Sequence, residues 1–226
     1  MNLVQLTEKA RSAAASGDYG TAEELLERGR NLLADEPSAE VLADYASTCG
    51  DWGSEELQAR ALRRAIGRRT QASFVVDLLG VLQHHLNSLN GEHRDSVAEE
   101  CLRLGALALD LVPTSDEGLR ADLTYNRGLR HLDLARSGKG GLLDQAEKDI
   151  RLYQDWVASS DTVPQHLRRG NVLALAGVEL GEILLLGGQR RRAADLLEEA
   201  IAALEAGGVA AWMTKRAYAL LERAWA

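Results

Sequence analysis

The sequence predicts an all-α protein, a superhelical array of about five helix–turn–helix repeats closed by a C-terminal helix. The chain is rich in Ala, Leu, Glu and Arg and has only three prolines among 226 residues, a composition that favours helices. Runs of β-branched residues are almost absent. Gly80 and Ala98 stand eighteen positions apart (98 − 80), and Gly128 and Ala146 repeat that spacing forty-eight residues later (128 − 80). A repeated helix–turn–helix pattern is typical of an array.

Each repeat is expected to contain a helix, a turn and a second helix. The first two repeats share the phrase Gly-Asp-aromatic-Gly-Ser/Thr, which begins at Gly17 and again at Gly50. Thr21 can cap the second helix of the first repeat, and Pro37 ends that helix. The expected helices, in order, cover residues 3–15, 21–37, 38–50, 55–69, 71–89, a stretch around Ala98, 115–137, 142–158, 164–186, 190–208 and 209–226.

These helices predict a single domain over residues 1–226. Its repeats cover approximately 1–37, 38–69, 70–113, 114–161 and 162–207, and the helix over 208–226 closes the open end of the array. Each repeat buries its apolar face only by stacking on a neighbour.

The fifth repeat carries small and bulky residues at fixed spacing: Leu180, Gly181, Leu184, Ala193, Leu197 and Ala200. This set resembles the tetratricopeptide repeat (TPR). The second repeat is degenerate, because Glu55 stands at the first Ala position. The spacing of eighteen in the third and fourth repeats, where the usual spacing is twelve, is similar to the TPR arrays of large bacterial signalling proteins. The resemblance implies a right-handed α-α superhelix, in which small residues let neighbouring helices approach closely.

In TPR arrays the first helices line a concave groove, so the resemblance implies ligand-binding residues one turn either side of the small position. They are Glu40, Asp44, Phe74, Asp77, His84, Asp122, Tyr125, Asn126 and Glu182. Five of these nine are carboxylates, which attract cations. The groove is therefore expected to bind a basic or amine-bearing peptide, with Phe74 and Tyr125 as apolar anchors. The alternative is that Phe74 and Tyr125 belong to the core and that the acids only keep the array soluble.

Two groups of arginines are candidates for contact with an anion or an acidic partner. Arg60, Arg64 and Arg68 lie late in a helix, where cations also suit the negative end of the helix dipole. Arg190, Arg191 and Arg192 begin a helix, where positive charge is unfavourable unless an anion or an acidic neighbour is close.

Composition and sequence pattern also limit the possible partners and the location of the protein. A formal net charge of −8 argues against nucleic acid as the main partner. No apolar run is long enough to span a membrane, and no secretory signal is visible. We therefore expect a cytoplasmic protein with Cys49 and Cys101 reduced. No catalytic motif stands out. The neighbouring His84 and His85 point about 100° apart on a helix, so neither a metal nor a cofactor is expected.

Three functions remain open. The first is a protein- or peptide-binding scaffold that uses the groove. The second is self-association through the last helix, which carries Trp212 and Trp225. The third is a small-molecule binder or an enzyme that reuses the fold, which would need a deep closed cavity with convergent polar groups.

Overall fold

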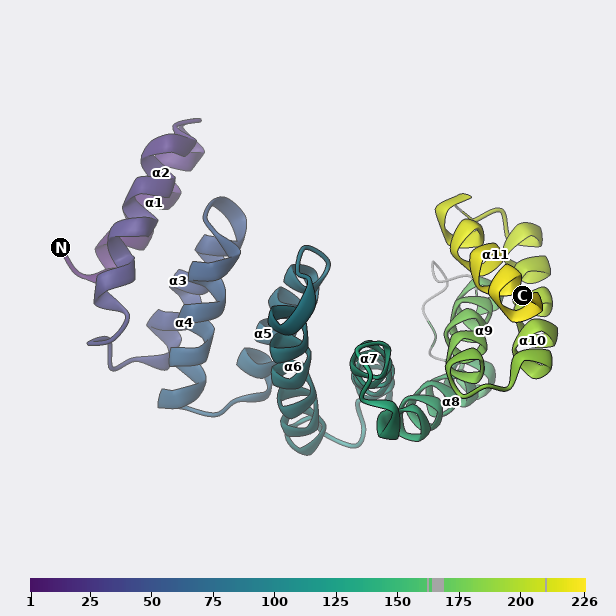
Figure 1. Cartoon of the computed structure of the whole chain (residues 1–226). Coiled ribbons are helices and arrows are strands. Elements are labelled where there is room, and N and C mark those ends of the chain that lie inside the picture. The colour runs from purple at the N-terminus through teal and green to yellow at the C-terminus, as the bar shows by residue number, and fades with distance from the viewer. Residues whose placement is uncertain (162, 164–168, 210) are drawn as a thin grey trace. The chain divides into compact units, whose positions relative to one another are not determined.

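The computed structural model describes residues 1–161, 163, 169–209 and 211–226. The expected helix start at Pro164 lies outside these described residues. The described part of the chain contains eleven α-helices and two short 3₁₀ helices, and no strand (Figure 1). This confirms the predicted all-α class. The chain divides into two compact bodies: an N-terminal body of residues 1–97 and 103–111, and a C-terminal body of residues 98–102 and 112–226.

The N-terminal body consists of helices joined by short turns. They are α1 (Leu3–Ala15), α2 (Tyr19–Gly29), η1 (Arg30–Leu32), α3 (Ala39–Trp52), α4 (Glu55–Arg68), α5 (Ala72–Leu86) and most of α6 (Gly91–Leu111). Helix α1 packs on α2 and α3, and α4 packs on α3 and α5. Successive helices therefore pair as a helix–turn–helix pattern requires.

Polar side chains fix where the helices of the N-terminal body begin. Asp18 accepts a hydrogen bond from the Thr21 backbone N–H, so α2 starts at Tyr19. The predicted cap at Thr21 is wrong, because Asp18 already fills that role and carries a charge that suits the helix N-terminus. Ser38 and Ser54 cap α3 and α4 in the same way.

A close contact between α2 and α3 depends on a glycine. Tyr45 of α3 is fully buried, and its hydroxyl donates a hydrogen bond to the backbone oxygen of Leu26. A Cβ atom at Gly29 would lie 2.5 Å from Cε2 of the Tyr45 ring. The phenol therefore occupies the space that any other residue at position 29 would need.

The C-terminal body repeats the same pairing. Its helices are α7 (Glu117–Arg136), η2 (Gly140–Leu142), α8 (Leu143–Ser159), α9 (Arg169–Leu186), α10 (Arg190–Ala206) and α11 (Ala211–Trp225). Helix α7 packs on α8, α9 packs on α10, and α11 packs on both α10 and α9.

Two repeat glycines make these helix pairs close, as predicted, and a third does not. A Cβ atom at Gly128 would lie 2.9 Å from Ile150 Cγ1, and one at Gly181 would lie 2.6 Å from Leu197 Cγ. Gly80 occupies the corresponding place in the sequence pattern, yet it is exposed, and a Cβ atom there would meet no atom within 4 Å. Close helix packing therefore does not explain Gly80.

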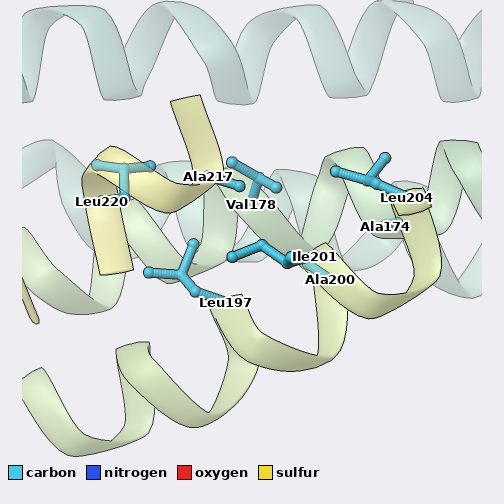
Figure 2. Packing of buried hydrophobic residues seen from close by; sticks show 8 residues of the cluster. All are labelled: Ala174, Val178, Leu197, Ala200, Ile201, Leu204, Ala217 and Leu220. Atoms are coloured by element: carbon cyan, nitrogen blue, oxygen red, sulfur yellow. The ribbon is translucent and has the colours of Figure 1, made fainter. Parts of the chain in front are cut away.

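Apolar side chains of three helices meet in the core of the C-terminal body (Figure 2). The cluster contains Ala174, Val178, Leu197, Ala200, Ile201, Leu204, Ala217 and Leu220. Burying one Leu side chain contributes about 1.5–3 kcal/mol. Helix α11 supplies Ala217 and Leu220, so it belongs to this core. No helix in the described ranges is both long and apolar enough to span a membrane.

Candidate binding surfaces

A hollow of about 580 Å³ lies in the N-terminal body between α3, α4 and α5. Its lining residues on α3 and on α5 recur about every turn, so one face of each helix borders the hollow. Small residues such as Ser47, Gly50 and Gly80 line it beside the apolar Val81. Gly80 therefore opens space at this surface, which accounts for its exposed position.

Carboxylates dominate the charge of this hollow. Asp51, Glu55 and Asp77 all line it. Glu55 forms a short contact with Nδ1 of His84, and its other oxygen lies 3.7 Å from Nδ1 of His85. Within the described part of the chain, the carboxylates of Asp51 and Asp77 have no hydrogen bond or ion pair. Partial desolvation of the carboxylate raises the pKa of Asp77.

The structure brings only part of the predicted N-terminal set into the hollow. Asp77 and His84 line it. Glu40 instead accepts a hydrogen bond from Nη1 of Arg69 at 2.8 Å, and Asp44 accepts one from Nη2 of Arg11 at 2.6 Å. Phe74 is only 7% exposed and belongs to the core.

A second feature, in the C-terminal body, is a network of partly buried ion pairs across α7, α9 and α11. We call it the ion-pair network; its members are Asp133, Arg136, Glu179, Glu182 and Arg216. Glu182 accepts hydrogen bonds from Arg136 at 2.9 and 2.6 Å and from Arg216 at 2.7 Å. Arg216 also binds both oxygens of Glu179 at 2.5 and 2.6 Å, and Arg136 reaches Asp133 at 2.7 Å.

The two arginines determine how Glu182 titrates. Burial by itself raises the pKa of Glu182, but the guanidinium groups of Arg136 and Arg216 outweigh burial and hold it below its usual range. Glu182 was predicted as a groove residue, and here its carboxylate is already bound on two sides. A sequence signal for the network exists, because Glu179 and Glu182 lie one turn apart in an otherwise apolar helix, where buried acids need partners.

A related pair joins α7 to α8. Asp149 accepts two hydrogen bonds from Arg127, both at 2.7 Å, and Nδ1 of His131 lies 3.5 Å from its Oδ2. Burial opposes ionisation of Asp149, yet Arg127 and His131 together hold its pKa below the usual range. This two-pronged contact fixes the orientation of the Arg127 side chain.

The other predicted residues of the C-terminal body lie along α7. The ring of Tyr125 stacks on Tyr153, with centroids 4.5 Å apart, and packs beside the apolar cluster around Val157. The Asn126 side chain donates to the backbone oxygen of Asp122 at 2.9 Å. The Asp122 carboxylate has no ion pair in the ranges that the structure describes, and burial raises its pKa.

The arginine groups differ in what they contact. Arg68 donates to the backbone oxygens of Ala34 at 2.9 Å and Glu36 at 3.2 Å, so it ties the end of α4 to the segment before α3. Arg60 and Arg64 are exposed on α4. Three exposed arginines, Arg190, Arg191 and Arg192, form the first turn of α10.

Sequence reasoning missed a second hollow, of about 430 Å³, between α8, α9 and α10. Its lining is mainly apolar and small, including Leu173, Gly177 and Ala203, and the acids Asp155 of α8 and Glu199 of α10 also line it. Small residues one turn apart on α9 were the available signal. Among the described residues, no group of three or more His, Cys, Asp or Glu is arranged to hold a metal ion.

The similarity of this chain to known proteins is limited to the fold. No family model matches the chain, and no curated protein sequence matches it. The crystal structure of MamA is similar, with a TM-score of 0.54 at 16% identity over 88% of this chain and 96% of that one. PilW, described as a widely conserved type IV pilus biogenesis factor, has a TM-score of 0.49 at 16% identity over 99% and 89% of the two chains. MamA is a TPR-like helical protein, and this chain has the same TPR-like, all-α fold.

Proposed function

We propose that this chain is a protein-binding module whose N-terminal hollow receives a basic segment of a partner. The observation that carries the proposal is a pair of carboxylates, Asp51 and Asp77, which line a hollow of about 580 Å³ and have no hydrogen bond or ion pair among the described residues. Ligand sites in proteins commonly have volumes in this range.

The titration of Asp77 supports a cationic ligand. Its pKa is raised because the charged form is partly desolvated, and in the described ranges the carboxylate has no counter-ion. A lysine or arginine side chain would supply that counter-ion and make a charge-assisted hydrogen bond. The small Gly50 and Gly80 leave room for such a side chain to approach the helix backbones.

From the groove residues predicted for the N-terminal body, the proposed site keeps Asp77 and His84. It adds Asp51 and Glu55, which also line the hollow. Of the two predicted groove carboxylates in the C-terminal body, Asp122 and Glu182, Asp122 has no ion pair in the described ranges, and it is the candidate for a separate contact with the partner. Glu182 is excluded from the proposed site because Arg136 and Arg216 already bind it.

The test is fluorescence anisotropy with two pools of labelled peptides of equal length, one rich in Lys and Arg and one rich in Asp and Glu. Wild type is expected to bind the basic pool more tightly, and added salt should weaken that binding. Asp77→Asn should raise the Kd about two- to fivefold, as expected for a partly exposed charge pair. Gly80→Leu should weaken binding by filling the hollow, and its Cβ atom meets no atom within 4 Å in the free protein.

Glu24→Gln is the matched control, because Glu24 is exposed on α2 and lies outside the hollow. Asp122→Asn tests the C-terminal contact separately. Equal binding of the two pools, or binding of the basic pool that neither Asp77→Asn nor Gly80→Leu reduces, would contradict the proposal.

A further inference from the structure

Helix α11 presents a cationic, aromatic face to solvent. Trp212 is 68% exposed, although α11 buries Ala217 and Leu220 in the core. At 100° per residue, Lys215, Ala219 and Arg223 lie on the same side of the helix as Trp212. Lys215 and Arg223 are exposed and have no ion pair within the described ranges.

The hollow between α8, α9 and α10 is apolar and acidic, which complements the aromatic, cationic face of α11. Leu173 and Ala174 of α9 and Leu196 of α10 give it an apolar lining. Its two acids, Asp155 on α8 and Glu199 on α10, are exposed and have no ion pair in the part of the chain that the structure describes. The hollow therefore suits an apolar group that is flanked by positive charges.

The α11 of the same chain does not occupy this hollow. Helix α11 packs on the side of α10 that carries Leu197, Ile201 and Leu204. The hollow shares Ala200 with that apolar cluster. Its other lining residues on α10 are Leu196, Glu199 and Ala203, which lie about 130° around the helix from Leu197, Ile201 and Leu204. No described residue of α11 lines the hollow, so an indole that entered it would come from another molecule.

We propose that Trp212 of one copy inserts into the α8–α9–α10 hollow of a second copy. The two surfaces of one chain are complementary in polarity and charge. The exposed indole of Trp212 lies beside Lys215 and Arg223, and the apolar hollow lies beside Asp155 and Glu199. A hollow of about 430 Å³ is large enough for an indole, and buried Trp side chains dominate many interfaces. Because each chain carries both surfaces, two copies can exchange them about a two-fold axis and close as a dimer.

The test is sedimentation velocity of the full chain over a range of concentrations. Wild type is expected to form a concentration-dependent dimer. Trp212→Ala should raise the dimer dissociation constant at least tenfold, the usual effect of removing a central interface anchor. Ala203→Phe, which fills the hollow from an exposed position, should have a similar effect. Trp225→Ala is the matched control, since Trp225 is 63% exposed and lies about 140° around α11 from Trp212, and it should leave the dimer unchanged.

Charge reversal is a second, independent test of the proposed dimer. E199K and K215E should each weaken the dimer, and the double variant E199K/K215E should restore it, because each interface then regains one opposite-charge contact. Circular dichroism of every variant shows whether the helices are retained. A wild type that stays monomeric at all concentrations overturns the proposal. A dimer that Trp225→Ala weakens as much as Trp212→Ala also overturns it.

Discussion

Nη2 of Arg216 lies 2.7 Å from Oε2 of Glu182, and Nη2 of Arg136 lies 2.6 Å from the same oxygen. One buried carboxylate oxygen of α9 therefore binds a guanidinium group from α7 and another from α11. Two arginines that would repel each other are held together by the acid between them, so each contact depends on the other.

Replacing Glu182 should destabilise the C-terminal body. Glu182→Ala leaves Arg136 and Arg216 close together without their shared carboxylate. Removing one partner of a fully buried pair costs 3–5 kcal/mol. Both arginines are about one-third to two-fifths exposed, so we expect a smaller loss of about 2 kcal/mol in the free energy of unfolding. Urea denaturation followed by circular dichroism measures it.

Glu198→Ala is the matched control for this measurement. Glu198 is exposed on α10, and its removal should change stability by no more than about 0.5 kcal/mol. Equal destabilisation by the two substitutions would show that the ion-pair network contributes nothing beyond loss of a side chain.

The stability of the chain should fall in acid because Glu182 and Asp149 have lowered pKa values. In the unfolded chain, Glu and Asp have pKa values of about 4.3 and 3.9. The unfolded chain therefore binds these protons at a higher pH than the folded chain does. Their contribution to stability is therefore fully present above about pH 5 and is lost as pH falls through the lowered folded values. Thermal unfolding followed between pH 3 and pH 7 measures this dependence.

Asp77 and Asp122 act in the opposite direction. Their pKa values are raised in the folded chain, so protonating them favours folding and partly offsets the acid loss. The double variant E182Q/D149N should have a flatter acid limb than wild type, whereas D77N/D122N should have a steeper one. The reverse order of the two slopes would contradict the assignment of these shifts.

Two glycines that look alike in the sequence should respond differently to alanine. Gly80→Ala should raise the free energy of unfolding by about 0.5–1 kcal/mol, because it removes a flexible residue from a helix interior without a clash. Gly181→Ala should lower it by about 1–3 kcal/mol, because the new Cβ meets the Leu197 side chain at 2.6 Å. Paired urea denaturation curves measure the difference in sign. If both variants were stabilised, α9 and α10 would be less tightly packed than the structure indicates.

Most of the fold could be predicted because the helix signals are local. Glycine turns, polar caps and the three- and four-residue spacing of apolar side chains each act within a few residues, and they gave the all-α class and the successive helices. The start of α2 was misjudged by two residues, because Asp18 and Thr21 are both acceptable caps and only the backbone geometry selects between them.

The candidate site was less predictable because it depends on contacts between helices. Carboxylates at similar positions in the repeats have different partners: Asp77 has none in the described ranges, Glu40 binds Arg69, and Glu182 binds two arginines. No spacing rule reveals which arginine on another helix reaches which acid. The single-domain organisation, the cytoplasmic location and the bacterial origin stay predictions.

The contact between Gly29 and Tyr45 has a consequence for the evolution of this chain. The phenol ring fills the space that a side chain at position 29 would need, and its hydroxyl satisfies a backbone oxygen of α2. Neither residue can change alone without a steric clash or a void. In homologous sequences the two positions should therefore covary, with a larger residue at 29 accompanied by a shorter one at 45.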